Sequence, residues 1–250
     1  MKVLALAAMI LVTGGEGEPV PTKAVESASV ELAFTGHSSR AGVSIGGAAG
    51  PGQVAIDDAY VSLRDVRLRE ASRCDEPGGS RVAAGPIVAE LVSGRAAGVE
   101  EPLNVRPGRY CRLEYTRRRA EGTSAAGADL RGHAILVRGR RDDGVRFVIR
   151  SRTQNAVQLL ARHPDGFSIV AGRQRLFLSV DLGRWLEGID LTSLVPGRGK
   201  NGIIRIDESS HRDLLRVFEN NLSAGIALCR GDPGASRECS SANRLAGAPR

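Results

Sequence analysis

The amino-acid sequence predicts a mostly β protein, an antiparallel β-sandwich that carries one C-terminal amphipathic helix. Three observations support this prediction. Apolar and polar residues alternate with a period of two in many short segments. Clusters of Gly, Pro, Asn and Asp, the residues that form turns, separate these segments. A helical period of apolar residues occurs in one segment of the last third of the chain.

The first strands are predicted in the N-terminal part of the chain. Alternation from Val30 to Phe34 indicates a strand, and residues 54–68 form a long second strand segment. The alternation of this segment changes phase near Tyr60 and again at Arg64-Asp65, as a β-bulge or a strand break requires. A shorter apolar strand is predicted from Ile87 to Val92.

A β-hairpin is predicted in the middle of the chain. The segments His133–Arg140 and Val145–Arg150 flank Asp142-Asp143-Gly144, where Asp-Gly supplies the positive φ angles of a tight turn. In the second segment the apolar residues would point inward and the arginines outward: Val145, Phe147 and Ile149 against Arg146 and Arg150. Further strands are predicted at Tyr110–Tyr115, Ala156–Leu160, Phe167–Val170, Arg175–Leu182 and Ile203–Ile206.

One amphipathic helix is predicted from Ser210 to Leu222. Ser210 followed by Asp213 resembles a capping box. Leu214, Phe218 and Leu222 repeat at the i, i+4, i+8 spacing of a buried helix face. Upstream of this helix, Trp185 is predicted to pack as a core aromatic side chain.

The N-terminus predicts export. Lys2 precedes the apolar run Val3–Val12, and small residues follow, which is the pattern of a cleavable signal peptide at residues 1–17. We expect an exported product, either periplasmic or extracellular. After the signal peptide, the chain is predicted to consist of a polar lead at 18–27, a β-sandwich domain at 28–228 and a flexible C-terminal tail at 229–250. The β-sandwich domain can form two lobes, at 28–119 and 128–228.

The four cysteines, Cys74, Cys111, Cys229 and Cys239, are an even number in a chain predicted to leave the reducing cytoplasm. Four cysteines allow three pairings. We favour Cys74 with Cys111 and Cys229 with Cys239, because the first pair would tie a loop to a strand and the second would close a short loop. None has the C-x-x-C spacing, which argues against a zinc site or a thioredoxin-like redox site.

The formal net charge is +7, and a basic protein often meets anionic partners. Of the 35 basic residues only three are lysines, an arginine bias that we attribute to a GC-rich genome. Binding to single-stranded nucleic acid would require aromatic residues among the arginines, and only Tyr110 and Tyr115 lie near the arginine cluster at 106–119. We therefore predict no nucleic-acid partner and, since no later apolar run is long enough, no transmembrane segment.

Candidate chemical sites are few. Gly42-Val43-Ser44-Ile45-Gly46 has the G-x-S-x-G spacing of a hydrolase nucleophile elbow, but a Gly-rich stretch follows where the elbow needs a helix. The histidines are scattered, and His133 and His163 are candidates for a metal site only if the fold brings them together. We predict no cofactor and nominate no catalytic residue.

Three segments resemble a group of bacterial exported β-sandwich domains of unknown function. They are Asp57–Leu63, which has a D-x-x-V-x-L pattern, Val88–Leu91, and Val105–Tyr110 with its Pro-Gly turn. Leu178–Leu182 is similar to a late strand of that group, so that the resemblance covers Ala28–Asp190. The lipobox cysteine of the group's lipoproteins is missing here. The resemblance implies no functional residue.

These observations favour a non-catalytic envelope or secreted protein with a binding or structural role. The alternative is a metal- or glycan-binding protein that uses His133, His163 or the acidic turns. A hydrolase is a third hypothesis, and it depends on Ser44 alone.

Overall fold

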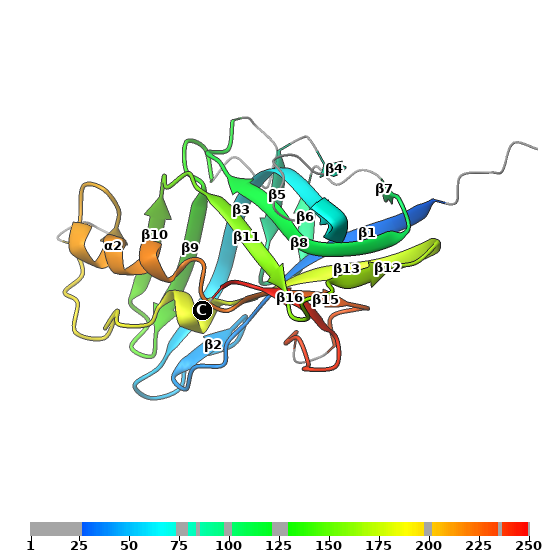
Figure 1. Ribbon diagram of the computed structural model, residues 1–250. Helices are drawn as coiled ribbons and strands as arrows, with labels where there is room; N and C mark the ends of the chain where they lie inside the picture. The colour runs from blue at the N-terminus through cyan, green and yellow to red at the C-terminus, as the bar shows by residue number, and fades with distance from the viewer. Residues whose placement is uncertain are drawn as a thin grey trace, which may run out of the picture.

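The computed structural model describes residues 27–73, 80–83, 86–97, 102–121, 130–197, 202–234 and 237–249. The protein is mostly β, with 51% of the structure in strands and 8% in helices. The strands belong to one strongly curled sheet with the shape of a half-barrel (Figure 1). The predicted signal peptide lies outside the described residues.

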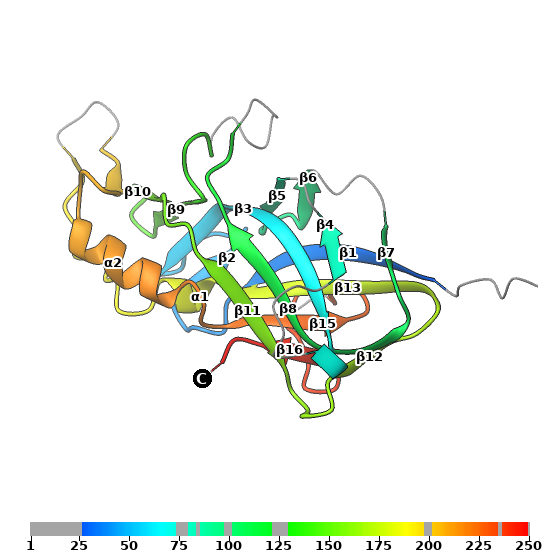
Figure 2. The same ribbon diagram turned by 45° about the horizontal axis from the view of Figure 1, so that its top comes forward.

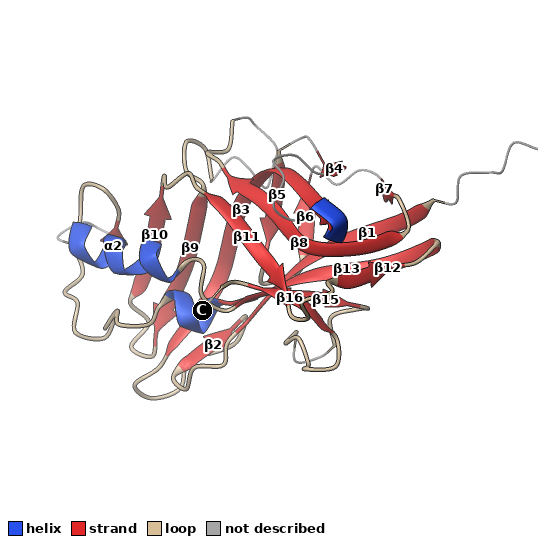
Figure 3. Cartoon of the chain, in the orientation of Figure 1, coloured by secondary structure: helices blue, strands red, loops and turns tan. Residues whose placement is uncertain are grey.

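The described residues form sixteen strands: β1 (Ala28–His37), β2 (Val43–Ile45), β3 (Val54–Glu70), β4 (Ser80–Ala83), β5 (Ile87–Glu90), β6 (Arg95–Ala97), β7 (Leu103–Val105), β8 (Gly108–Arg117), β9 (Ile135–Arg141), β10 (Arg146–Ser151), β11 (Ala156–Ala161), β12 (Phe167–Ile169), β13 (Gly172–Asp181), β14 (Ile204–Ile206), β15 (Ile226–Arg230) and β16 (Arg244–Gly247). Two helices, α1 (Leu182–Trp185) and α2 (Arg212–Asn221), and a 3-10 turn at Ala71–Arg73 accompany them (Figure 3). The main path across the sheet is β14-β10-β9-β3-β8-β11-β16-β15-β13-β1-β7.

Most neighbouring strands are antiparallel, but β1 with β13, β2 with β3 and β10 with β14 are parallel. The two-sheet sandwich predicted from the sequence is not observed. The reason is that β1 pairs with β13 along its whole length, and so joins the strands into one sheet. Strands from the two predicted lobes, 28–119 and 128–228, are interleaved in this sheet, and most of the predicted junction between them lies outside the described residues.

The longest strand, β3, has different neighbours along its two halves. Its first half pairs with β9 and its second half pairs mainly with β8. The register shifts between Ile56 and Asp58 and again around Asp65, which has a φ of 53°. Such bulges bend a strand, and Figure 2 shows the curvature of β3. The shift predicted around Asp65 is confirmed, whereas the one predicted near Tyr60 occurs at Ile56–Asp58.

The main core is one cluster of buried apolar side chains from the long strands and both helices. Phe34, Phe147 and Trp185 are among its largest fully buried members. Trp185 of α1 meets Phe218 of α2 edge-on, with ring centroids 6.0 Å apart. Trp185 is therefore a core aromatic residue, as predicted.

Helix α2 lies within the range predicted from Ser210 to Leu222, and β15 and β16 follow it in the chain. It buries Leu215 and Phe218. The predicted capping box at Ser210 is wrong, because the N-cap residue is His211, which has a left-handed backbone and no side-chain cap hydrogen bond.

A buried arginine connects this helix to the sheet. Arg117 on β8 is only 1% exposed. Its Nη2 donates to the backbone oxygen of Leu222 at 2.8 Å, and its Nη1 donates to the Asn155 side-chain oxygen at 3.3 Å. Carbonyl groups at a helix C-terminus carry partial negative charge and lack partners in the helix. The Arg117 guanidinium therefore holds the end of α2 against β8.

The predicted hairpin is observed as β9 and β10. Its turn has one positive φ, at Gly144 (80°), rather than positive angles at both central residues. Phe147 and Ile149 are buried while Arg146 is exposed and Arg150 half-buried, in agreement with the predicted faces. Phe147 lies opposite Gly139 in the ladder, where the absence of a side chain leaves room for the aromatic ring.

The C-terminal stretch from residue 229, which was predicted to be flexible, contains β16. This strand pairs with both β11 and β15, and so lies inside the sheet rather than outside it. Ala246 on β16 is fully buried. No helix among the described residues is long and apolar enough to cross a membrane.

We expect Gly139→Ala to lower the free energy of unfolding by about 1–3 kcal/mol, because an added Cβ would collide with the Ala55 carbonyl oxygen and the Phe147 ring. Gly108→Ala is the matched control in another strand, since a Cβ there meets no atom within 4 Å. Urea denaturation measures both variants. Equal unfolding midpoints for the two would contradict the prediction.

Candidate functional site

Four arginines surround Val148 on the outward face of β9, β10 and β14. Val148 is paired with Arg138 on one side and with Arg205 on the other. Arg146 and Arg150 lie two positions before and after it on the same strand. Paired residues and residues two apart share a face of a sheet, so that all four arginines start from the same face around Val148, which belongs to a small buried apolar cluster with Leu136.

These arginines line a groove of about 390 Å³. Val148 and Ile203 are apolar residues of its lining, and Asp57 and Asp58 add two carboxylates against the four guanidinium groups. The groove is therefore electropositive. Along the strand the four arginines span about 13 Å, and across the strands they span about 10 Å.

The carboxylates are engaged at one side of the groove. Arg138 Nη1 lies 3.8 Å from Asp58 Oδ2, and Arg140 Nη1 lies 3.0 Å from Asp57 Oδ1. Within the described residues, Arg146, Arg150 and Arg205 form no ion pair with a carboxylate. We name these four groove arginines, Arg138, Arg146, Arg150 and Arg205, the arginine cradle.

Two further observations show that the cradle is electrostatically unfavourable in the free protein. Arg140 and Arg146 are directly opposite in the ladder, an arrangement in which like charges destabilise a sheet. The Nε of Arg150 is buried and, in the described part of the chain, has no hydrogen-bond partner. A buried polar group without a partner costs free energy. A bound anion would offset the repulsion between the like charges, since guanidinium groups bind carboxylate, sulfate and phosphate oxygens in forked geometry.

The predicted metal candidates are not brought together. His133 precedes β9, at the level of Leu63 in the ladder, and His163 follows β11, beyond the level of Arg69. Six residues of strand separate these levels, a distance of roughly 20 Å. Among the described residues, no three His, Cys, Asp or Glu side chains form a group that could hold a metal ion.

His133 lies instead near the edge of the cradle. Its Nδ1 is 3.0 Å from the Arg131 backbone oxygen. Burial lowers its pKa, the hydrogen bond to Arg131 raises it, and the positive charges of Arg152 and Arg150 lower it further, so that the pKa lies below its ordinary value. His133 is therefore better suited to be neutral than charged beside these arginines.

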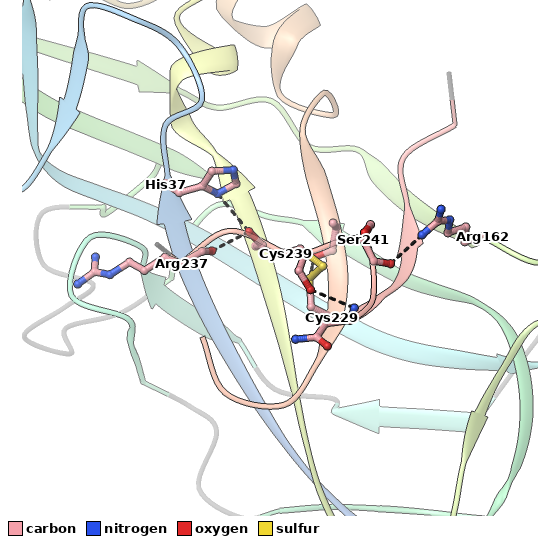
Figure 4. The surroundings of a disulfide bond; sticks show 10 residues. His37, Arg162, Cys229, Arg237, Cys239 and Ser241 are labelled. Carbon is pink, nitrogen blue, oxygen red and sulfur yellow. Dashed lines mark hydrogen bonds between the residues drawn. A yellow bond between two sulfur atoms is a disulfide. The ribbon is translucent and has the colours of Figure 1, made fainter. Parts of the chain in front are cut away.

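Cys229 and Cys239 form a disulfide with a Cα–Cα distance of 5.9 Å, which confirms the predicted pair (Figure 4). A disulfide is compatible with an oxidising, exported environment. Cys74 lies outside the described residues, so that the pair Cys74–Cys111 stays a prediction.

A hydrogen-bonded chain lies beside this disulfide (Figure 4). Ser179 Oγ is 2.9 Å from the backbone oxygen of Arg237 and 3.1 Å from His37 Nδ1. The carbonyl oxygen can only accept, so that Ser179 donates its proton to Arg237 and His37 Nδ1 donates to Ser179. This is the reverse of the arrangement in which a histidine activates a serine nucleophile. Ser179 is 1% exposed, and its side chain therefore has a structural role, linking His37 to the Arg237 backbone.

Ser44, the residue of the G-x-S-x-G match, is the middle residue of β2 and pairs with β3. Its hydroxyl lies 3.2 Å from the Ala48 backbone oxygen and 3.4 Å from that of Val54, to either of which it can donate. A nucleophile elbow requires a sharp turn from a strand into a helix, and the chain after Ser44 continues through a loop into β3. The geometry gives this serine no nucleophilic role.

The chain matches no protein-family model, and neither a curated protein nor a solved structure is significantly similar to it. The candidate site is therefore defined by its geometry. Sequence alternation identified Arg146 and Arg150 as outward residues. It could not show that Arg138 and Arg205 lie beside them, because this depends on the register between strands. The alternating arginines in 138–150 were the available signal.

Replacing both Cys229 and Cys239 by Ala should lower the free energy of unfolding by about 2–3 kcal/mol, the loop-entropy value for a closure of this length. Chemical denaturation under oxidising conditions measures this difference without reducing other cysteines. An unchanged unfolding midpoint would show that the closed loop adds nothing to stability.

Acidification should weaken the fold through His37. Burial lowers its pKa, Asp181 and Glu238 raise it, and Arg244 lowers it, with the folded pKa below the ordinary value. The unfolded chain therefore binds this proton more readily, so that His37 stabilises the fold above a pH of about 6.5 and loses this contribution as the pH falls through its folded pKa.

The variant His37→Gln, whose amide can still donate to Ser179, should show a smaller loss of unfolding free energy between neutral and mildly acidic pH than the native protein. Urea denaturation across this pH range gives the comparison. Identical pH profiles for the two proteins would exclude His37 as a source of acid sensitivity.

Proposed function

We propose that this chain is an exported, non-catalytic binding protein whose arginine cradle holds a compact multivalent anion. The observation that carries this proposal is the arrangement of Arg138, Arg146, Arg150 and Arg205 around Val148, in a groove with only two carboxylates. Several guanidinium groups in one groove favour a ligand with several negative oxygen atoms.

The energetics of the free protein support an anion more than a neutral ligand. Three of the four cradle arginines, Arg146, Arg150 and Arg205, form no ion pair with a carboxylate among the described residues, although Arg150 is close enough to Asp207 to lower the pKa of that carboxyl. Arg146 also lies directly opposite Arg140, an arrangement of like charges that destabilises a sheet. A ligand with two or more negative charges would offset this excess of positive charge.

Other features support the exported and non-catalytic parts of the proposal. The signal-peptide pattern at residues 1–17 and the disulfide Cys229–Cys239 are both consistent with an oxidising compartment, periplasmic or extracellular. The hydrogen bonds of Ser179 and Ser44 do not activate either hydroxyl. We also keep as a proposal the relationship to bacterial exported β domains of unknown function. The separation of His133 from His163 gives the metal-binding alternative no support.

Pyrophosphate is a suitable probe because it is small and carries several negative oxygen atoms. Isothermal titration calorimetry at low ionic strength should show one site per chain in the mature protein. The double variant Arg146→Gln/Arg150→Gln should bind at least tenfold more weakly, since a hydrogen bond to a charged group contributes about 1.5–3 kcal/mol and about 1.4 kcal/mol corresponds to a factor of ten.

The matched control is Arg109→Gln/Arg216→Gln, which removes two positive charges from exposed arginines outside the groove. Its affinity for pyrophosphate should stay within about twofold of the native value, because exposed charges at a distance are screened by salt. Equal weakening in both double variants would indicate a response to net charge only. That result, or no binding by the native protein, would exclude the cradle as an anion site.

A further inference from the structure

A second hollow lies on the sheet far along the ladder from the cradle, between β11, β16 and the loop closed by the disulfide. Its volume is about 800 Å³, larger than that of the arginine groove. Its walls contain Leu160, Arg162, Glu238 and Arg244, and the hydroxyl-bearing Ser240 and Ser241 belong to the loop side. A hollow of this size matches the pockets that hold small organic ligands.

The floor of this hollow is formed in part by a glycine. Gly247 on β16 lines it and pairs with Leu160 on β11. An added Cβ at Gly247 would meet only the Ile226 backbone oxygen within 4 Å, at 3.6 Å, which is an ordinary contact. The space above Gly247 is therefore open, and a side chain could be placed there without strain.

The loop side of the hollow is held in place. The disulfide fixes Cys239 to β15, and Arg162 Nη1 donates to the Ser241 backbone oxygen at 2.7 Å (Figure 4). The backbone nitrogen of Arg244 donates to the Ser240 oxygen at 3.1 Å. These contacts organise the hollow before any ligand binds, which reduces the entropy cost of binding.

The chemistry of the lining indicates the ligand. Leu160 is 41% exposed, an unusual position for a large apolar side chain in this protein, and Ala248 and Pro249 extend the apolar part of the lining. Two guanidinium groups, of Arg162 and Arg244, outnumber the single carboxylate of Glu238. Within the described residues Arg244 forms no ion pair.

We propose that this hollow binds a small organic anion with an apolar body. The apolar body would cover Leu160 above the Gly247 floor, and the acidic group would contact the guanidinium of Arg244. The site is separate from the arginine cradle, and neither proposal depends on the other.

Anilinonaphthalene sulfonate, a fluorescent aromatic sulfonate, has the required chemistry. Titrated into the native, fully oxidised protein, it should give a saturable increase in fluorescence. Gly247→Val should weaken this binding at least tenfold by filling the floor. Arg244→Gln, at an exposed position that packing does not require, should weaken it several-fold, and it keeps the test decisive if Gly247→Val is poorly folded.

The double variant Arg109→Gln/Arg216→Gln, outside both sites, is the control and should bind the sulfonate as the native protein does. The cradle variant Arg146→Gln/Arg150→Gln is measured beside it. Native-like binding by Gly247→Val with an intact unfolding midpoint would overturn the proposal, as would the absence of any fluorescence increase in the native protein. Loss of binding in the cradle variant alone would assign the sulfonate to the cradle and would equally overturn it. Pyrophosphate titration of Gly247→Val, expected to be unchanged, separates the two sites.

Discussion

The parallel pairing of β1 with β13 is the constraint on which the rest of the structure depends. It joins residues 28–37 to residues 172–181 over ten positions. No tight turn can connect parallel neighbours, so that all of the intervening chain must fold as an excursion that returns to the same place. The long, bent β3 makes this return possible, because its two halves pair with β9 and mainly with β8 and turn the sheet into a half-barrel. The same closure places Ser179 beside His37.

Local sequence patterns predicted those parts of the fold that depend on neighbouring residues. The alternation in Val145–Arg150 assigned Phe147 and Ile149 to the core and the two arginines to the surface, and the irregularity at Asp65 was visible as a change of phase. The pattern could not show which distant strand pairs with which. The pairings of β1 with β13 and of β14 with β10 are non-local and parallel, and the alternation of these strands would look the same in a sandwich.

The candidate sites show the same division. Cys229 and Cys239 are close in sequence, so that the short loop between them favoured this pair among the three possible pairings. Half of the cradle, Arg146 and Arg150, could be predicted as outward residues because they share a strand. Arg138 and Arg205 join them only through the register of two ladders. The predicted cap at Ser210 failed because the chain enters α2 through a left-handed His211, a tertiary effect on the backbone that a capping motif does not include.

The loop between Cys229 and Cys239 has one more consequence, for the response of the protein to proteolysis. Its two ends are joined covalently, one on β15 and the other shortly before β16. A protease that nicks the peptide chain inside this loop therefore releases no fragment, because the sulfur bridge still attaches β16 to β15. The nicked strand also keeps its hydrogen bonds to β11 and β15. Such damage would become visible only after reduction, when the C-terminal peptide could separate from the sheet.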